Sequence, residues 1–145
     1  MKKFFAIAAL MVATLTVSAQ DYNWAVGFRF GYPCQGIAGK MQLGENAIEA
    51  GLATDLSNYF RLDAVYEWQQ PVIADGFHLY YGAGAYTNIG NQYFGLGAEG
   101  VVGLEYRIPI NFPLAVSLDY RPLLNFVGGF GADLVNFSFG VKFCF

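Results

Sequence analysis

Apolar and polar residues alternate along this chain over stretches of roughly ten residues that are separated by short turn signals. A period of two places successive side chains on opposite faces of a β-strand. In the last stretch, one face consists of Phe137, Phe139, Val141, Phe143 and Phe145, and the other of Ser138, Gly140, Lys142 and Cys144. The whole pattern predicts eight strands, over Tyr22–Tyr32, Gln35–Leu43, Ala47–Thr54, Phe60–Gln69, His78–Thr87, Tyr93–Ile108, Leu114–Arg121 and Leu134–Phe145.

The polar face of these strands carries equal numbers of positive and negative side chains. We expect them to form an ion-pair network of twelve residues, namely Arg29, Lys40, Glu49, Arg61, Asp63, Glu67, Glu99, Glu105, Arg107, Asp119, Arg121 and Lys142. A solvated surface has no need of such balance, whereas unpaired charges in a narrow lumen are strongly destabilising. The rest of this face is mostly small, with glycine at ten positions, which leaves space for long side chains. The sequence therefore predicts an all-β fold, an eight-stranded antiparallel up-and-down transmembrane β-barrel with a charged interior.

Aromatic residues of the apolar face gather near the two ends of the predicted strands. One predicted girdle consists of Trp24, Trp68, Tyr106, Phe143 and Phe145, and the other of Phe30, Phe60, Tyr120 and Phe137. Two aromatic belts are typical of the two membrane–water interfaces.

The N-terminus has the order of a secretory signal peptide. Lys2 and Lys3 precede the apolar run Phe4–Val17, and small residues end at Ala19. We expect residues 1–19 to be cleaved and residues 20–145 to form the barrel domain of the exported protein. That mature chain has six basic and eleven acidic residues, a net charge of −5 with neutral histidine, so nucleic acid is not an expected partner.

Eight short strands behind a signal peptide, a balanced charged lumen and the terminal Phe145 resemble the small outer-membrane β-barrel proteins of the OmpA/OmpX type. The resemblance covers residues 20–145 and implies a monomer in the outer membrane of a Gram-negative-type cell. The implied partners are outer-membrane lipids, the barrel-assembly machinery through the C-terminal strand, and a surface partner at the extracellular loops. One departure is that the connections here look short, whereas OmpX-like proteins extend strands beyond the membrane.

The sequence motifs that could indicate catalysis or cofactor binding lack the structural context that such sites need. Residues 95–100 match GxGxxG by letter, but a dinucleotide site needs a helix after the loop. The single histidine, His78, is expected at the rim opposite the loop that carries Ser57, while Ser117 and Ser138 face the lumen. We expect His78 to cap a turn or to bond a lumen carboxylate. Neither an enzymatic activity nor a cofactor or metal site is predicted.

The two cysteines, Cys34 and Cys144, are expected at opposite ends of the barrel and therefore as free thiols. A two-residue turn at Gly44-Glu45 would place Lys40 directly opposite Glu49, where the two would form a cross-strand ion pair. The apolar, glycine-containing segment Leu123–Gly131 has two equal interpretations: a flexible loop that contacts lipid, the barrel mouth or a partner, or a continuation of the flanking strands.

The function expected from the sequence is a structural or surface-interaction role in the cell envelope, as an integral barrel with a plugged, ion-paired lumen. Two alternatives stay open, a small-solute channel and a soluble, lipocalin-like ligand-binding barrel.

Overall fold

The computed structural model describes residues 23–70, 77–108 and 113–145, and within them the chain is all-β. The predicted signal peptide, the turn expected between the fourth and fifth strands at 71–76, and all of the turn expected at Pro109–Pro113 except Pro113 lie outside the described residues. Ten strand segments are present: β1 (Trp24–Tyr32), β2 (Gln35–Leu43), β3 (Asn46–Thr54), β4 (Tyr59–Gln69), β5 (Phe77–Gly90), β6 (Tyr93–Arg107), β7 (Leu114–Tyr120), β8 (Leu123–Val127), β9 (Gly131–Asp133) and β10 (Phe137–Cys144). No helix in the described ranges is long and apolar enough to cross a membrane.

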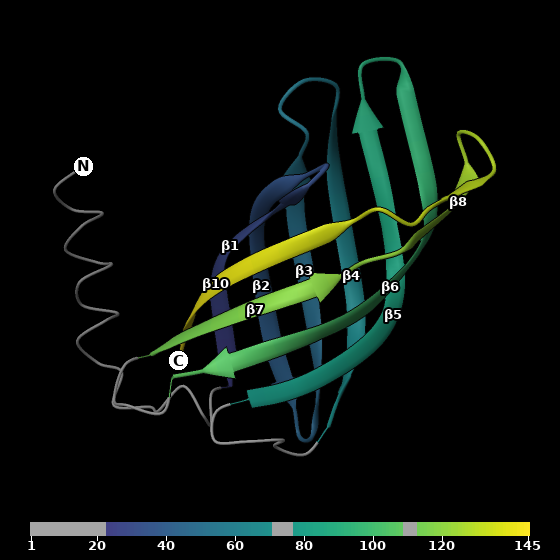
Figure 1. Ribbon diagram of the computed structural model, residues 1–145. Coiled ribbons are helices and arrows are strands. Elements are labelled where there is room, and N and C mark those ends of the chain that lie inside the picture. The colour runs from purple at the N-terminus through teal and green to yellow at the C-terminus, as the bar shows by residue number, and fades with distance from the viewer. Residues whose placement is uncertain (1–22, 71–76, 109–112) are drawn as a thin grey trace, which may run out of the picture.

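The strands close into an eight-stranded antiparallel barrel (Figure 1). Each strand from β1 to β5 pairs with the strand that follows it in the chain. β6 then pairs with β7, β7 pairs with β10, and β10 pairs with β1, which closes the barrel. The predicted number of strands and their antiparallel order are confirmed. We call the two ends of the barrel upper and lower as they lie in Figure 1, where the β3–β4, β5–β6 and β8–β9 hairpins stand at the upper end.

The seventh and eighth strands of the barrel are each interrupted once and then continue. β7 pairs with the lower part of β6, and β8 pairs with its upper part. Pro122 stands between them and has no backbone N–H to donate, but its carbonyl accepts the Gly100 N–H at 2.9 Å. β8 turns into β9 through Gly128 and Gly129, whose φ angles of 85° and 125° suit glycine. The segment Leu123–Gly131 is therefore a continuation of the flanking strands and not a long loop.

The last predicted strand begins later than its pattern indicated. Regular pairing starts at Phe137, and residues 134–136 are irregular. The Asp133 carboxylate accepts the Val135 N–H at 3.1 Å, a local side-chain bond that competes with the strand ladder.

The upper hairpins are longer than the sequence indicated. β5 runs to Gly90, so the predicted polar loop Asn88–Gln92 is reduced to the turn residues Asn91 and Gln92. β6 spans 15 residues, within one residue of the predicted Tyr93–Ile108, whereas β5 spans 14 residues and runs three residues beyond its predicted end at Thr87. Cross-strand pairing overrode the turn preference of asparagine and glycine in this segment.

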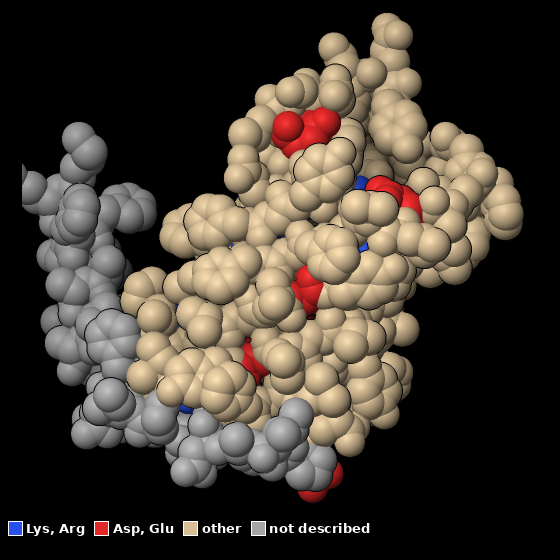
Figure 2. Space-filling model, in the orientation of Figure 1, with Lys and Arg blue, Asp and Glu red and all other residues tan. Residues whose placement is uncertain are grey.

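Side chains alternate strictly between the barrel's interior and its outer face. In β1 the aromatic side chains are exposed on the outside while Ala25 and Arg29 are buried within. Figure 2 shows one side of the molecule, on which uncharged residues cover nearly all of the described surface. The polar face is thus the inner face, as the charge balance predicted.

Candidate functional site: the charged interior and the upper cavity

All twelve charged residues predicted for the interior are buried in the barrel. They come from every strand of the barrel wall except β5, whose inner face carries Tyr80 and Tyr86. Eleven of the twelve take part in ion pairs with one another. Because charged groups removed from water are costly unless paired, these contacts decide whether the interior is stable.

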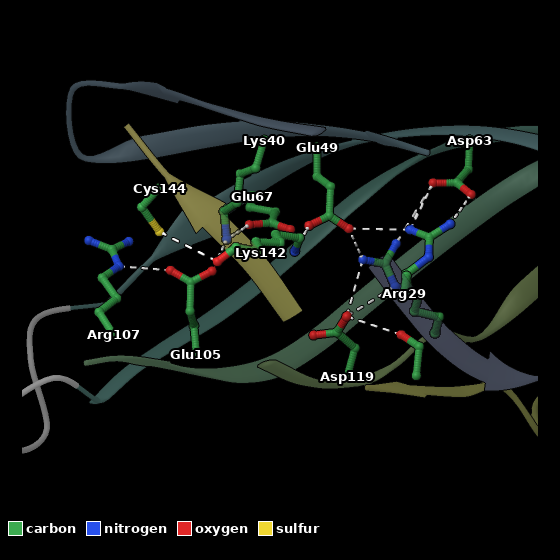
Figure 3. A network of polar contacts seen from close by, with 12 residues as sticks. Arg29, Lys40, Glu49, Asp63, Glu67, Glu105, Arg107, Asp119, Lys142 and Cys144 are labelled. Atoms are coloured by element: carbon green, nitrogen blue, oxygen red, sulfur yellow. Dashed lines mark hydrogen bonds and ion pairs between the residues drawn. The ribbon is translucent and has the colours of Figure 1, made fainter. Parts of the chain in front are cut away.

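Glu49 on β3 lies at the centre of this network (Figure 3). One of its carboxylate oxygens accepts Arg29 at 3.2 Å and also pairs with Arg121, and the other pairs with Lys142. These three cations come from β1, the junction after β7, and β10, so a single carboxylate joins four parts of the wall.

Arg121 is the cation with the most carboxylate partners. Besides Glu49, its guanidinium lies 3.0 Å from Glu99, 3.3 Å from Asp119 and 4.0 Å from Asp63. Asp63 is held in turn by Arg29, through two nitrogens of that guanidinium. The interruption between β7 and β8 therefore carries a residue that ties the interior together.

A second group of ion pairs lies toward the lower end of the barrel. The Lys40 ammonium is 2.6 Å from Glu67 and 3.0 Å from Glu105, and Arg107 donates to Glu105 at 2.7 Å. Lys40 also stands over the Tyr80 ring, 4.4 Å from its centroid. The predicted register of Lys40 opposite Glu49 is confirmed, across the two-residue turn at residues 44–45.

Glycines on the inner face make space for this network. A Cβ at Gly51 would lie 2.6 Å from an Arg29 nitrogen and 2.9 Å from an Asp63 oxygen. A Cβ at Gly103 would lie 2.5 Å from Asp119. A side chain at either position would collide with the charged groups. This explains why glycines stand beside the long charged residues on the inner face.

Arg61 on β4 differs from the other interior cations because its partners are neutral. Its Nε donates to the Asn88 side-chain oxygen at 2.9 Å, and its Nη2 lies 3.4 Å from the Tyr59 hydroxyl. The guanidinium also stands 5.2 Å from the centroid of the Tyr86 ring. Among the described residues, no carboxylate lies within ion-pair distance of Arg61. The prediction that Arg61 shares the ion-pair network therefore differs from its observed contacts.

A cavity of about 520 Å³ opens above Arg61 at the upper end of the barrel. Its floor consists of buried side chains, Arg61, Tyr86, Asn88 and Leu123. Its edge is formed by exposed or half-buried residues from the three upper hairpins, among them Asn58, Tyr93 and Asp133. The sequence did not predict this cavity. Asn88 was expected in a loop, Leu123 lay in a segment that could be either loop or strand, and only the pairing of both residues in strands brings them beside Arg61.

The loop between β3 and β4, which forms part of the cavity edge, is held by Asp55. Its Oδ1 accepts the backbone N–H groups of Asn58 at 2.8 Å, Ser57 at 3.0 Å and Tyr59 at 3.1 Å. These bonds, the one from Asn58 above all, lower the pKa of Asp55 to about 2.

The aromatic residues predicted as girdles lie on the outer face near the two ends. At the lower end Trp24, Trp68 and Phe143 are exposed, and at the upper end Phe30, Phe60 and Phe137 are exposed. Two residues are only half-exposed, because Tyr106 packs on Phe77 and Tyr120 on Phe137, with ring centroids 4.6 and 5.2 Å apart.

The remaining candidates for chemistry are spread over the barrel. His78 stands opposite Glu105 near the lower end, and Ser57 lies in an upper loop. Ser138 donates to Asp119 at 3.1 Å within the interior. Within the described part of the chain, no group of histidine, cysteine and acidic residues could hold a metal ion. Cys34 and Cys144 are free thiols, as predicted.

In comparisons with known proteins, the chain matches no protein-family model and no curated protein.

Proposed function

We propose that this chain is an integral outer-membrane β-barrel with a plugged lumen, and that it has a structural or surface-interaction role in the cell envelope. The observation that carries the proposal is the inverted distribution of side chains: charged residues are buried inside the barrel, and large apolar residues are exposed outside it. In water this arrangement would leave an apolar surface around the whole barrel, far larger than the patches that soluble monomers tolerate. In a bilayer the same surface contacts hydrocarbon.

Strand lengths support the membrane placement. β1, β2 and β3 each contain nine residues, and a tilted membrane-spanning strand needs about 9–11. The exposed tryptophans and phenylalanines at the two ends suit the two interfaces. Together with the signal peptide expected at residues 1–19, this favours export to the outer membrane of a Gram-negative-type cell.

The ion-pair network supports a plugged lumen. The cavity beside Arg29, Asp63 and Arg121 measures about 20 Å³, room for about one water molecule. A continuous water path past these side chains would require the ion pairs to separate. We therefore propose a non-conducting barrel that acts without an enzymatic step.

The partners of this proposal follow from its surfaces. Membrane lipids contact the outer face, the barrel-assembly machinery recognises β10, and a surface partner binds the upper hairpins. The fold is an eight-stranded barrel like those of the OmpA/OmpX type, and the extended β5–β6 hairpin adds to that likeness. We propose a monomer, because the described strands close the barrel on itself and, at mid-height, each strand of its wall pairs with a neighbour on both sides.

The test is membrane fractionation combined with gel mobility before and after boiling. A folded membrane barrel resists unfolding in detergent until it is heated, so we expect the protein in the outer-membrane fraction with a mobility that changes on boiling. Recovery from the periplasm without detergent would instead support the soluble ligand-binding barrel. Stepwise ion conductance in planar bilayers would support the channel.

A further inference from the structure

The upper cavity has the size and the composition of a small-molecule site. Its volume of about 520 Å³ falls within the range of about 300–1,000 Å³ that ligand pockets occupy. The cavity is open to the outside, and its lining residues come from the β3–β4 loop, the β4 strand and the β5–β6 and β8–β9 hairpins. The β3–β4 loop and the two hairpins stand at the upper end of the barrel in Figure 1. A ligand can therefore enter the cavity without any change in the barrel.

Arg61 supplies a preorganised positive charge at the floor. The residue is only 8% exposed, and its described partners are the neutral Asn88 and Tyr59 side chains and the rings of Tyr59 and Tyr86. Its Nη1 donates no hydrogen bond within the described part of the chain. A buried guanidinium without a carboxylate gains strongly from an anion, and a planar carboxylate fits its nitrogens best.

The charges around the cavity limit the ligand to a single negative charge. Arg61 is the one cation among the lining residues, all of which the structure describes, and Asp133 at the edge is negative. A phosphate dianion or a polyanion would meet the repulsion of Asp133 with only one guanidinium to offset it. A carboxylate bound to Arg61 neutralises the guanidinium, so the only net charge left in the cavity lining is that of Asp133.

The rest of the lining suits hydroxyl groups. Four asparagines, each with amide donors and an acceptor oxygen, line the cavity: Asn58, Asn88, Asn91 and Asn125. Tyr59 and Tyr93 add aromatic faces, 6.5 Å apart between centroids, on which the C–H face of a sugar ring can pack. Asn88 and Asn125 already accept hydrogen bonds from Arg61 and Tyr86, and Asn58 donates to Asp55, so a ligand would use the remaining donor and acceptor positions of these amides. A purely apolar ligand would leave those positions unused.

We propose that the upper cavity binds a sugar acid of about monosaccharide size, with its carboxylate on Arg61 and its hydroxyls on the surrounding asparagines. The site goes beyond the proposed membrane role and does not depend on it, because the cavity is formed by the barrel itself. In the membrane placement proposed above, the upper cavity faces the cell exterior and binds acidic saccharides there.

The experiment is a calorimetric titration of the folded full-length mature protein, in detergent micelles, with D-glucuronate, D-glucose and inorganic phosphate. We expect glucuronate to bind at least tenfold more tightly than glucose or phosphate. The Arg61→Gln variant is expected to weaken glucuronate binding at least about tenfold and to leave glucose unchanged, since it removes a charged hydrogen-bond donor to the carboxylate. The Arg61→Lys variant keeps the charge and should recover only part of the loss.

A pair of tyrosine variants keeps the test independent of Arg61. Tyr93→Leu removes an aromatic face at the cavity edge, and Tyr81→Leu removes a tyrosine of similar exposure from the outer face, 46% against 41% for Tyr93. We expect about threefold weaker binding for the first variant and no change for the second. Equal affinities for glucuronate and glucose would overturn the proposal, as would phosphate displacing glucuronate at equal concentration, or equal effects of the two tyrosine variants.

Discussion

Glu49 and Arg121 lie 72 residues apart in the chain and form an ion pair in the middle of the barrel. Glu49 also pairs with Arg29 and Lys142 and is fully buried. Loss of its charge would leave these cations short of a carboxylate. Breaking a buried pair by removing one partner costs about 3–5 kcal/mol, so we expect Glu49→Gln to lower the free energy of unfolding by about that amount. Urea titration of the refolded barrel in lipid vesicles measures it.

The control for this variant is Glu45→Gln. Glu45 is an exposed residue of the β2–β3 turn, where the same substitution should change stability by less than about 0.5 kcal/mol. Equal stability of Glu49→Gln and the wild type would contradict a structural role for the network.

Arg61 and Arg121 should differ when each is replaced by glutamine. Arg121 pairs with four carboxylates, whereas the described partners of Arg61 are neutral. We expect Arg121→Gln to destabilise the barrel by at least about 3 kcal/mol and Arg61→Gln by about 1–2 kcal/mol. The same urea titration compares them, and a greater loss for Arg61→Gln would show that Arg61 belongs to the ion-pair network after all.

Much of the barrel follows from local patterning. Because successive side chains in a strand alternate, the residues around Phe137–Phe145 already show which face is apolar, and the same holds for each predicted strand. Lys40 opposite Glu49 could be predicted because a two-residue turn fixes the register of a hairpin.

The ion-pair partners could not be predicted in the same way. Lys40 contacts Glu67 and Glu105 across the interior, from strands that are not its neighbours, and such contacts depend on the tilt and stagger of the closed barrel. The upper cavity was missed for a related reason. Asn88 lies in a segment rich in asparagine and glycine that resembles a turn, and Asn125 lies in an apolar, glycine-containing segment that could be loop or strand. Only long-range pairing makes both segments strands.

Leu118 tests the outer face at mid-height. It is 61% exposed on β7, with Phe139 beside it on β10 and Leu104 beside it on β6. An arginine at the bilayer midplane costs about 2–4 kcal/mol, so Leu118→Arg should reduce folding into vesicles by that amount, measured by urea titration.

The matched variant is Phe130→Arg. Phe130 is 91% exposed at the β8–β9 turn, above the proposed membrane, and its replacement should change stability by less than about 0.5 kcal/mol. If the barrel were soluble, both positions would face water, and the two variants would behave alike.

The hydrogen bonds of Asp55 predict that the β3–β4 loop becomes less stable in acid. Its pKa in the folded barrel is about 2, below the value of about 4 in an unfolded chain, so the ionised carboxylate stabilises the β3–β4 loop above pH 4. This stabilisation declines as the pH falls from about 4, the pKa in the unfolded chain, to about 2, the pKa in the folded barrel. Carboxyl NMR should give a midpoint near 2 for Asp55, accompanied by a shift of the Tyr59 amide signal. The Asp55→Asn variant should lack the shift, and a midpoint near 4 would show that the N–H bonds do not form.

The two tryptophans of the chain offer the most direct test of the membrane placement. Trp24 and Trp68 are 50% and 41% exposed on the outer face near the lower end. Their fluorescence should be quenched by brominated lipids in vesicles, and more strongly when the bromines lie near the headgroups than at the bilayer centre. Tryptophan emission that brominated lipids leave unchanged, while soluble acrylamide quenches it, would contradict a membrane-spanning barrel.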